Sequence, residues 1–208
     1  MKNFEIKNND CHAALAMTKS VQSGRSMIEM LGVLAIIGVL SVGGIAGYSK
    51  AMMKYRINKT IEQITLIAGN VRTFFSSQNN FEGIDCLNDS SSENNCKILK
   101  KAKLVPDEMW NSTYTSLVSV FGTDTDIEQY DNKTLIISVH EIPTQACIEL
   151  VSHNWNNANI TTIVETVSPN RDETHYAYES IISIDEAVTA CSDDGGTTIS
   201  AINFYVKL

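Results

Sequence analysis

The sequence predicts an α+β fold in which one long N-terminal helix packs through its second half against a C-terminal antiparallel sheet. Two observations lead to this prediction. Residues 25–76 contain no proline and are apolar first and amphipathic afterwards. That pattern allows one helix of about fifty residues, roughly 75 Å long at 1.5 Å per residue. Residues 77–208 then mix short β-rich runs with short helical ones, which is typical of an α+β domain.

The composition bounds the function before any motif is considered. At 208 residues the chain allows one ordinary domain and one additional element. Its formal net charge is −8, and no basic stripe stands out in the sequence. Because nucleic-acid binding depends on neutralising phosphates, an acidic chain of this kind is a poor candidate for it. We therefore expect no direct nucleic-acid site.

The first half of the long helix has the composition of a membrane span. Residues 1–24 are polar and mildly basic, whereas residues 27–48 are almost wholly apolar and contain one charge, Glu29. About twenty such residues are enough for a helix to cross the hydrocarbon core of a bilayer. Equal numbers of basic residues precede and follow the span, so the distribution of basic residues does not fix its orientation.

The second half of the helix, residues 49–76, has an apolar face. Apolar residues recur there at spacings of three and four, which places them on one side of a helix. They are Ile57, Ile61, Ile64, Ala68, Val71 and Phe75. A plain membrane anchor has no need of such a face, so we expect a globular domain, residues 77–208, to pack on it.

The remaining chain gives the elements of that domain. An Asn/Ser-rich loop follows the long helix, and a short helix is expected from Lys97 to Leu104, before Pro106. Two more short helices are expected, with Asp185 as the N-cap of the second. They span residues 144–153, just after Pro143, and 185–191. Strands are expected at residues 117–121, 134–139, 160–167 and 197–206.

Four of the five cysteines lie in the predicted globular domain, at Cys86, Cys96, Cys147 and Cys191. An even number suits disulfides in an oxidising compartment, but four cysteines allow three pairings and spacing alone does not choose among them. A zinc site is the rival interpretation. It is disfavoured because the chain has no C-x2-C pair.

The segment that leads into the apolar run carries the most specific signal. Residues 23–30 read SGRSMIEM: a glycine after a short polar leader, then a hydrophobic helix with an early glutamate. The chain resembles type IV pilin precursors at Gly24, Glu29 and throughout residues 24–48. The resemblance implies that a membrane-embedded prepilin peptidase cuts between Gly24 and Arg25, removes residues 1–24 and methylates the new N-terminus.

The resemblance also implies a role for Glu29. A carboxylate inside hydrocarbon is costly and usually has a partner and a purpose. In type IV pilins the glutamate pairs with the N-terminal amine of a neighbouring subunit. By analogy, the partners of this chain are other copies of itself, the peptidase and the pilus assembly machinery. The resemblance also implies that the precursor lies in the inner membrane and the mature chain in an extracellular pilus, which would serve adhesion, aggregation or conjugative DNA transfer.

Several features depart from the commonest pilin pattern. Arg25 stands where an apolar residue is usual, and Ala46 stands where many pilins have a proline. Glycines cluster at residues 43–47, so we expect local unwinding there when subunits pack. The long leader and the spaced cysteines are similar to the type IVb, PilS-type class. That similarity implies a Cys147–Cys191 disulfide, and Cys86 and Cys96 would then close the loop after the long helix.

Other functions have less support. The sequence contains no P-loop, G-x-G-x-x-G, G-x-S-x-G or H-E-x-x-H motif, so we expect no enzyme activity, cofactor or metal. Histidines such as His140 and His153 are scattered and are interpreted as surface or cap residues. The alternatives that remain are a type II secretion pseudopilin, a minor pilin, and a membrane-anchored extracellular binding module. A secretory signal cut near Gly47 is a further alternative.

Overall fold

The computed structural model describes residues 27–87, 96–113, 115–167, 173–178, 182–192 and 198–208. The chain separates into two compact units, Met1–Ala46 and Gly47–Leu208. The predicted leader, with Gly24 and Arg25, lies outside the described residues.

One continuous helix, α1 (Met27–Phe75), occupies the range predicted for the long helix. It ends where the amides of Gln78 and Asn79 both donate to the carbonyl of Phe75, and Asn79 adopts a left-handed φ of 54°. Asparagine tolerates this conformation better than most residues, so it suits a helix terminus. Residues 43–47 are helical. The unwinding expected there concerns packed subunits and stays a prediction.

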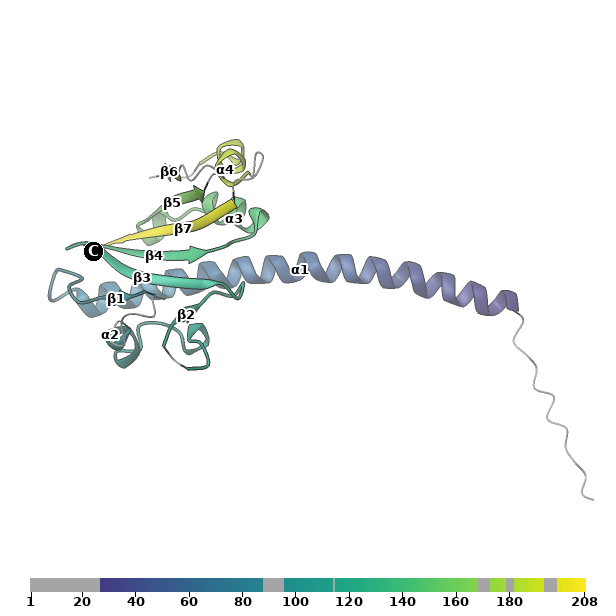
Figure 1. Ribbon diagram of the computed structural model, residues 1–208, viewed down its shortest axis with the longest axis horizontal. Helices are drawn as coiled ribbons and strands as arrows, with labels where there is room; N and C mark the ends of the chain where they lie inside the picture. Colours follow the sequence, from purple (N-terminus) through teal and green to yellow (C-terminus); the bar gives the residue numbers. More distant parts are fainter. Residues whose placement is uncertain (1–26, 88–95, 114, 168–172, 179–181, 193–197) are drawn as a thin grey trace, which may run out of the picture. The chain divides into compact units, whose positions relative to one another are not determined.

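The second unit contains an antiparallel sheet with strand order β1-β3-β4-β7-β5-β6, and β2 also pairs with β3 (Figure 1). The strands are β1 (Asp85–Cys86), β2 (Leu117–Val118), β3 (Asp124–Asp131), β4 (Thr134–His140), β5 (Ile160–Val167), β6 (Glu173–Tyr178) and β7 (Thr198–Lys207). The C-terminal strand β7 therefore lies between β4 and β5, at the centre of the sheet. The strands predicted over residues 134–139, 160–167 and 197–206 are confirmed as β4, β5 and β7.

The strand predicted over residues 117–121 is wrong beyond Val118, because Ser119 and Gly122 form a turn there. Three strands were not predicted at all. β3 reads DTDIEQYD, and of its residues only Thr125 and Ile127 are buried, so its charged outward-facing positions resemble a loop. β1 has only two residues, and β6 reads ETHYAY, without an apolar run.

The short helices are α2 (Lys97–Lys101), α3 (Thr144–Val151) and α4 (Ile184–Cys191), with 3-10 turns at Asp107–Met109 and Asn156–Ala158. α2 is shorter than predicted, because Lys103 adopts a left-handed φ of 51°. The predicted N-cap Asp185 is also wrong. The cap of α4 is Ser183, whose hydroxyl accepts from the amide of Glu186 while the Glu186 carboxylate accepts from the amide of Ser183. This is a capping box.

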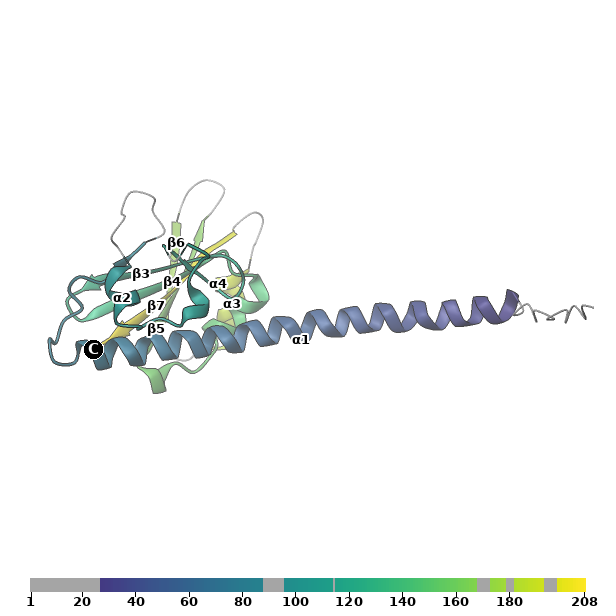
Figure 2. The same cartoon turned by 90° about the horizontal axis from the view of Figure 1, so that it is seen from below.

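The core lies between the second half of α1 and one face of the sheet (Figures 1 and 2). The predicted apolar face is confirmed: all six residues are buried except Ile61, which is half-buried against the core. On the sheet, the core is formed by alternate residues of the two central strands, β4 and β7. These residues lie opposite one another in the register of the two strands. They are Leu135, Ile137 and Val139 from β4 and Val206, Phe204 and Ile202 from β7.

Candidate functional site

The first part of α1 carries a continuous apolar surface that its own unit leaves exposed. Twelve large apolar side chains between Met27 and Ile45 are exposed, with Met27 at 85% and Val39 at 75%. Within the part of the chain that the structure describes, α1 is the one helix long and apolar enough to cross a bilayer. A surface of this extent needs either lipid or protein to cover it.

Glu29 lies in the first turn of α1 and is exposed. Acidic side chains are favoured there because the helix macrodipole is positive at its N-terminus. None of the ion pairs found among the described residues includes Glu29. The predicted processing residues, Gly24 and Arg25, lie outside the described residues, so the structure gives no geometry for them.

Polar side chains attach the second half of α1 to the segment that follows α2. The amine of Lys59 lies 2.9 Å from Glu108 Oε1, and the amide nitrogen of Gln63 donates to the same oxygen at 2.9 Å. Two turns further along, Asn70 Nδ2 donates to the carbonyl of Leu104 at 3.0 Å. The hydrogen bond from Lys59, followed by that from Gln63, lowers the pKa of Glu108. These contacts fix residues 104–108 along the helix.

Arg72 of α1 donates three hydrogen bonds to backbone carbonyls. Its Nε donates to the carbonyl of Lys207 at 2.6 Å, its Nη2 donates to Asn159 at 2.8 Å, and its Nη1 donates to Ala158. One guanidinium thus joins the helix to the end of β7 and to the turn before β5. Burial lowers the pKa of Arg72 from its ordinary value, but a guanidinium stays charged at any pH of interest.

A further cross-link joins α1 to α3, where Lys54 forms an ion pair with Glu149. The Lys54 side chain is 61% exposed, so water and salt screen this pair and it contributes at most about 1 kcal/mol. None of the polar residues that hold α1 in place was singled out from the sequence as a contact. Their partners lie 34 to 135 residues away. Several of those partners are backbone carbonyls, which leave no trace in the sequence.

Both disulfides implied by the resemblance are present. Cys147 of α3 is joined to Cys191 of α4, with their Cα atoms 5.9 Å apart, and Cys86 of β1 is joined to Cys96 just before α2. All four are buried. The first disulfide links the two short helices, and the second closes the loop between β1 and α2.

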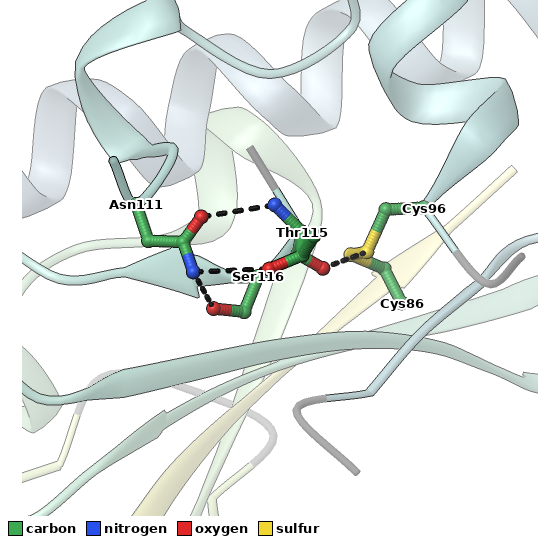
Figure 3. The surroundings of a disulfide bond; sticks show 5 residues. All are labelled: Cys86, Cys96, Asn111, Thr115 and Ser116. Carbon is green, nitrogen blue, oxygen red and sulfur yellow. Dashed lines mark hydrogen bonds between the residues drawn. A yellow bond between two sulfur atoms is a disulfide. The ribbon is translucent and has the colours of Figure 1, made fainter. Parts of the chain in front are cut away.

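A turn held by Asn111 lies beside the Cys86–Cys96 disulfide (Figure 3). The Asn111 side chain accepts from the amide of Thr115 at 2.9 Å and donates to Ser116 Oγ at 2.6 Å. The carbonyl of Thr115 lies 3.6 Å from Cys96 Sγ. The start of α2 and the turn before β2 are therefore in direct contact.

Of the histidines, His140 at the end of β4 has a partner that the sequence did not reveal. Its Nε2 lies 2.9 Å from Asp126 Oδ2 on the neighbouring strand β3. His153 packs against Trp155, and burial lowers its pKa from the ordinary value. The described residues contain no group of three or more potential metal ligands among their His, Cys, Asp and Glu side chains.

The family profile described as "PilS N terminal" matches residues 54–203. Two curated relatives, each called the major structural subunit of bundle-forming pilus, come from Escherichia coli O111:H- and from Escherichia coli O127:H6 (strain E2348/69 / EPEC). Each is 20% identical over 200 residues, which cover 92% of this chain and 97% of the relative. A type IVb pilin from Salmonella typhi aligns in structure with a TM-score of 0.46 and 13% identity, over 72% of this chain and 98% of that one. Because the matched residues make up well over half of the chain, the chain belongs to the PilS N-terminal family and is a pilin.

Proposed function

We propose that this chain is the major subunit of an extracellular pilus and that it polymerises through the apolar part of α1. As a pilin it is a structural protein and not an enzyme. The proposal rests chiefly on the exposed apolar surface from Met27 to Ile45. Full burial of a large apolar side chain stabilises by about 1.5–3 kcal/mol, so twelve of them amount to about 18–36 kcal/mol. That exceeds the net stability of most domains, so the surface cannot stay in water.

Two environments can cover this surface in turn. Before assembly, the bilayer of the inner membrane covers it, and in the filament the same helix of other subunits does. The rest of the fold suits this transfer, because Gly47–Leu208 has its own core and its own disulfides. The globular unit can therefore keep its structure while the apolar segment changes its surroundings.

Maturation precedes polymerisation in this scheme. A prepilin peptidase cuts after Gly24, and Arg25 becomes the methylated N-terminus, with Glu29 fifth in the mature chain. Inside the filament the Glu29 carboxylate pairs with the N-terminal amine of an adjacent subunit. A buried charge without a partner costs several kcal/mol, so only the register that pairs both groups is stable. The pilus assembly machinery extracts the subunit from the membrane.

The names of the relatives point to a role for the finished filament. The relatives from Escherichia coli are named for a pilus that forms bundles. Aggregation through filament bundling is therefore the first activity to test for this chain, ahead of adhesion or conjugative DNA transfer.

The test of the proposal is the identity of the mature chain in sheared surface filaments. We expect intact-mass spectrometry to find this chain as the main component, beginning at methylated Arg25. A Gly24→Val variant should keep residues 1–24 and give no filaments, whereas the neighbouring variant Ser23→Ala should be processed normally. Filaments that lack this chain, or contain it with the leader attached, would contradict the proposal.

A further inference from the structure

The two turns of α1 that follow the apolar run expose aromatic and cationic side chains that the fold does not use. Tyr48 is 66% exposed and Tyr55 is 58% exposed. Lys50 is also exposed, and the first residue of α1 that is buried in the core is Ile57. Met53 packs against the core and Lys54 contacts Glu149, but Tyr48, Lys50 and Tyr55 remain exposed beside them.

These residue types have a common preference. Tyrosine rings gather at the boundary between the hydrocarbon core and the headgroups, because one edge of the ring is apolar and the hydroxyl needs water. Lysine side chains at the same depth bury their methylenes and extend the amine towards the lipid phosphates. Among the ion pairs found in the described part of the chain, none includes Lys50, whereas Lys54 already contacts Glu149.

The spacing along the helix agrees with this preference. Between Glu29 and Lys50 the chain has no charged residue. Residues 30–49 form a continuous helix, and twenty residues at 1.5 Å each extend about 30 Å, which is the thickness of the hydrocarbon core. Both charges can thus lie at a boundary with water, one on each side of the bilayer.

We propose that residues 48–56 bind the phospholipid headgroups of the bilayer that the precursor crosses, and that they set the depth of the apolar helix. The rings of Tyr48 and Tyr55 lie at headgroup level, and Lys50 pairs with lipid phosphate. This inference rests on the membrane stage of the proposed function and adds a consequence to it. Glu29 is hydrated at the opposite boundary while the subunit is in the membrane, and it becomes buried only on entering the filament.

The experiment places a fluorescent probe at residue 48. The full chain carrying Tyr48→Trp is reconstituted in vesicles of phosphatidylethanolamine and phosphatidylglycerol. The acyl chains are brominated either near the headgroups or near the bilayer centre. Trp110 and Trp155 are buried in the globular unit, and their signal is measured separately in the chain that keeps Tyr48. We expect quenching of Trp at position 48 chiefly by bromine near the headgroups.

Lys50→Leu is the variant that tests the anchor. It extends the uncharged run to residue 53, four residues or about 6 Å. We expect the probe to move by up to that distance towards the bilayer centre, so that the deeper bromines quench it more. Lys50→Arg should restore the native quenching profile. Lys101→Leu removes an exposed lysine of α2 and should leave the profile unchanged.

The outcomes separate the two claims. If the chain inserts and Lys50→Leu gives the same profile as Lys101→Leu, the headgroup anchor is wrong while the membrane stage stands. If Lys50→Leu keeps the native depth but loses filaments, residues 48–56 contact another subunit instead, and the anchor is again wrong. If the full chain does not enter vesicles at all, the membrane stage of the proposed function fails, and the anchor fails with it.

Discussion

Arg72 offers the clearest prediction about what holds the long helix on the globular unit. Its guanidinium donates to three backbone carbonyls, from Lys207, Ala158 and Asn159. Methionine at this position keeps the apolar stem and helix propensity of arginine but leaves all three carbonyls without this donor. Lysine keeps the charge but has one nitrogen in place of the three that now donate.

The expected loss follows from the exposure of the three bonds. Those to Lys207 and Asn159 are exposed, so each contributes about 0.5–1 kcal/mol, and the part-buried one to Ala158 contributes about 1.5 kcal/mol. We expect Arg72→Met to lower the free energy of unfolding by about 3 kcal/mol and Arg72→Lys by about half of that. For a unit of this size the first value corresponds to a fall in Tm of about 6–12 °C.

The assay is equilibrium urea unfolding of the full chain in detergent, followed by tryptophan fluorescence. Trp155 is a suitable reporter because it is buried, and its ring centroid lies 5.1 Å from that of Phe204 in β7. Lys97→Met serves as the control, since Lys97 is exposed on α2. If Arg72→Met falls within about 0.5 kcal/mol of this control, the three contacts do not stabilise the fold and the reasoning is wrong.

Three further predictions concern other contacts. The pKa of Glu108 in the folded chain is lowered below its unfolded value of about 4.3. Its contacts therefore stabilise the fold at pH values above the unfolded pKa, and this stabilisation is lost as the pH falls through the folded pKa. The difference in urea midpoint between native chain and Glu108→Gln should therefore shrink below about pH 4; a constant difference would count against it. Replacing Cys147 and Cys191 together by alanine should cost about 4 kcal/mol by loop entropy, and an unchanged Tm would contradict this. Ser183→Ala should cost about 1 kcal/mol through loss of the capping box, as measured by the same unfolding, and a loss no larger than that of Lys97→Met would refute it.

The elements that could be predicted from the sequence are those in which buried apolar residues form a recognisable pattern along the chain. α1 was predicted because its apolar residues recur at three and four, and β4 because Thr134–His140 is rich in β-branched and apolar residues. β3 was missed because four of its eight residues are acidic and only one side faces the core. A strand of that kind is recognised only from its pairing with β4, which is not local information.

The functional residues also fall into a group that could be predicted from the sequence and a group that could not. The apolar run and Glu29 could be predicted because their chemistry is unusual anywhere in a chain. The polar contacts that attach the second half of α1 to the rest of its unit could not be predicted. Arg72, Asn70 and Glu108 resemble solvated surface residues in sequence, and their roles depend on groups brought to them by the sheet and by the segment after α2.

The central claim is that one buried acid finds its cation on an adjacent copy of the chain. The direct test is the quantity of sheared surface filaments from cells that produce Glu29→Gln, compared with Glu62→Gln, which neutralises an exposed acid elsewhere on α1. We expect Glu29→Gln to reduce filaments by more than tenfold while the subunit remains in the membrane fraction, and Glu62→Gln to leave them at the native level. Native amounts of filament from Glu29→Gln would show that subunits assemble without this pairing.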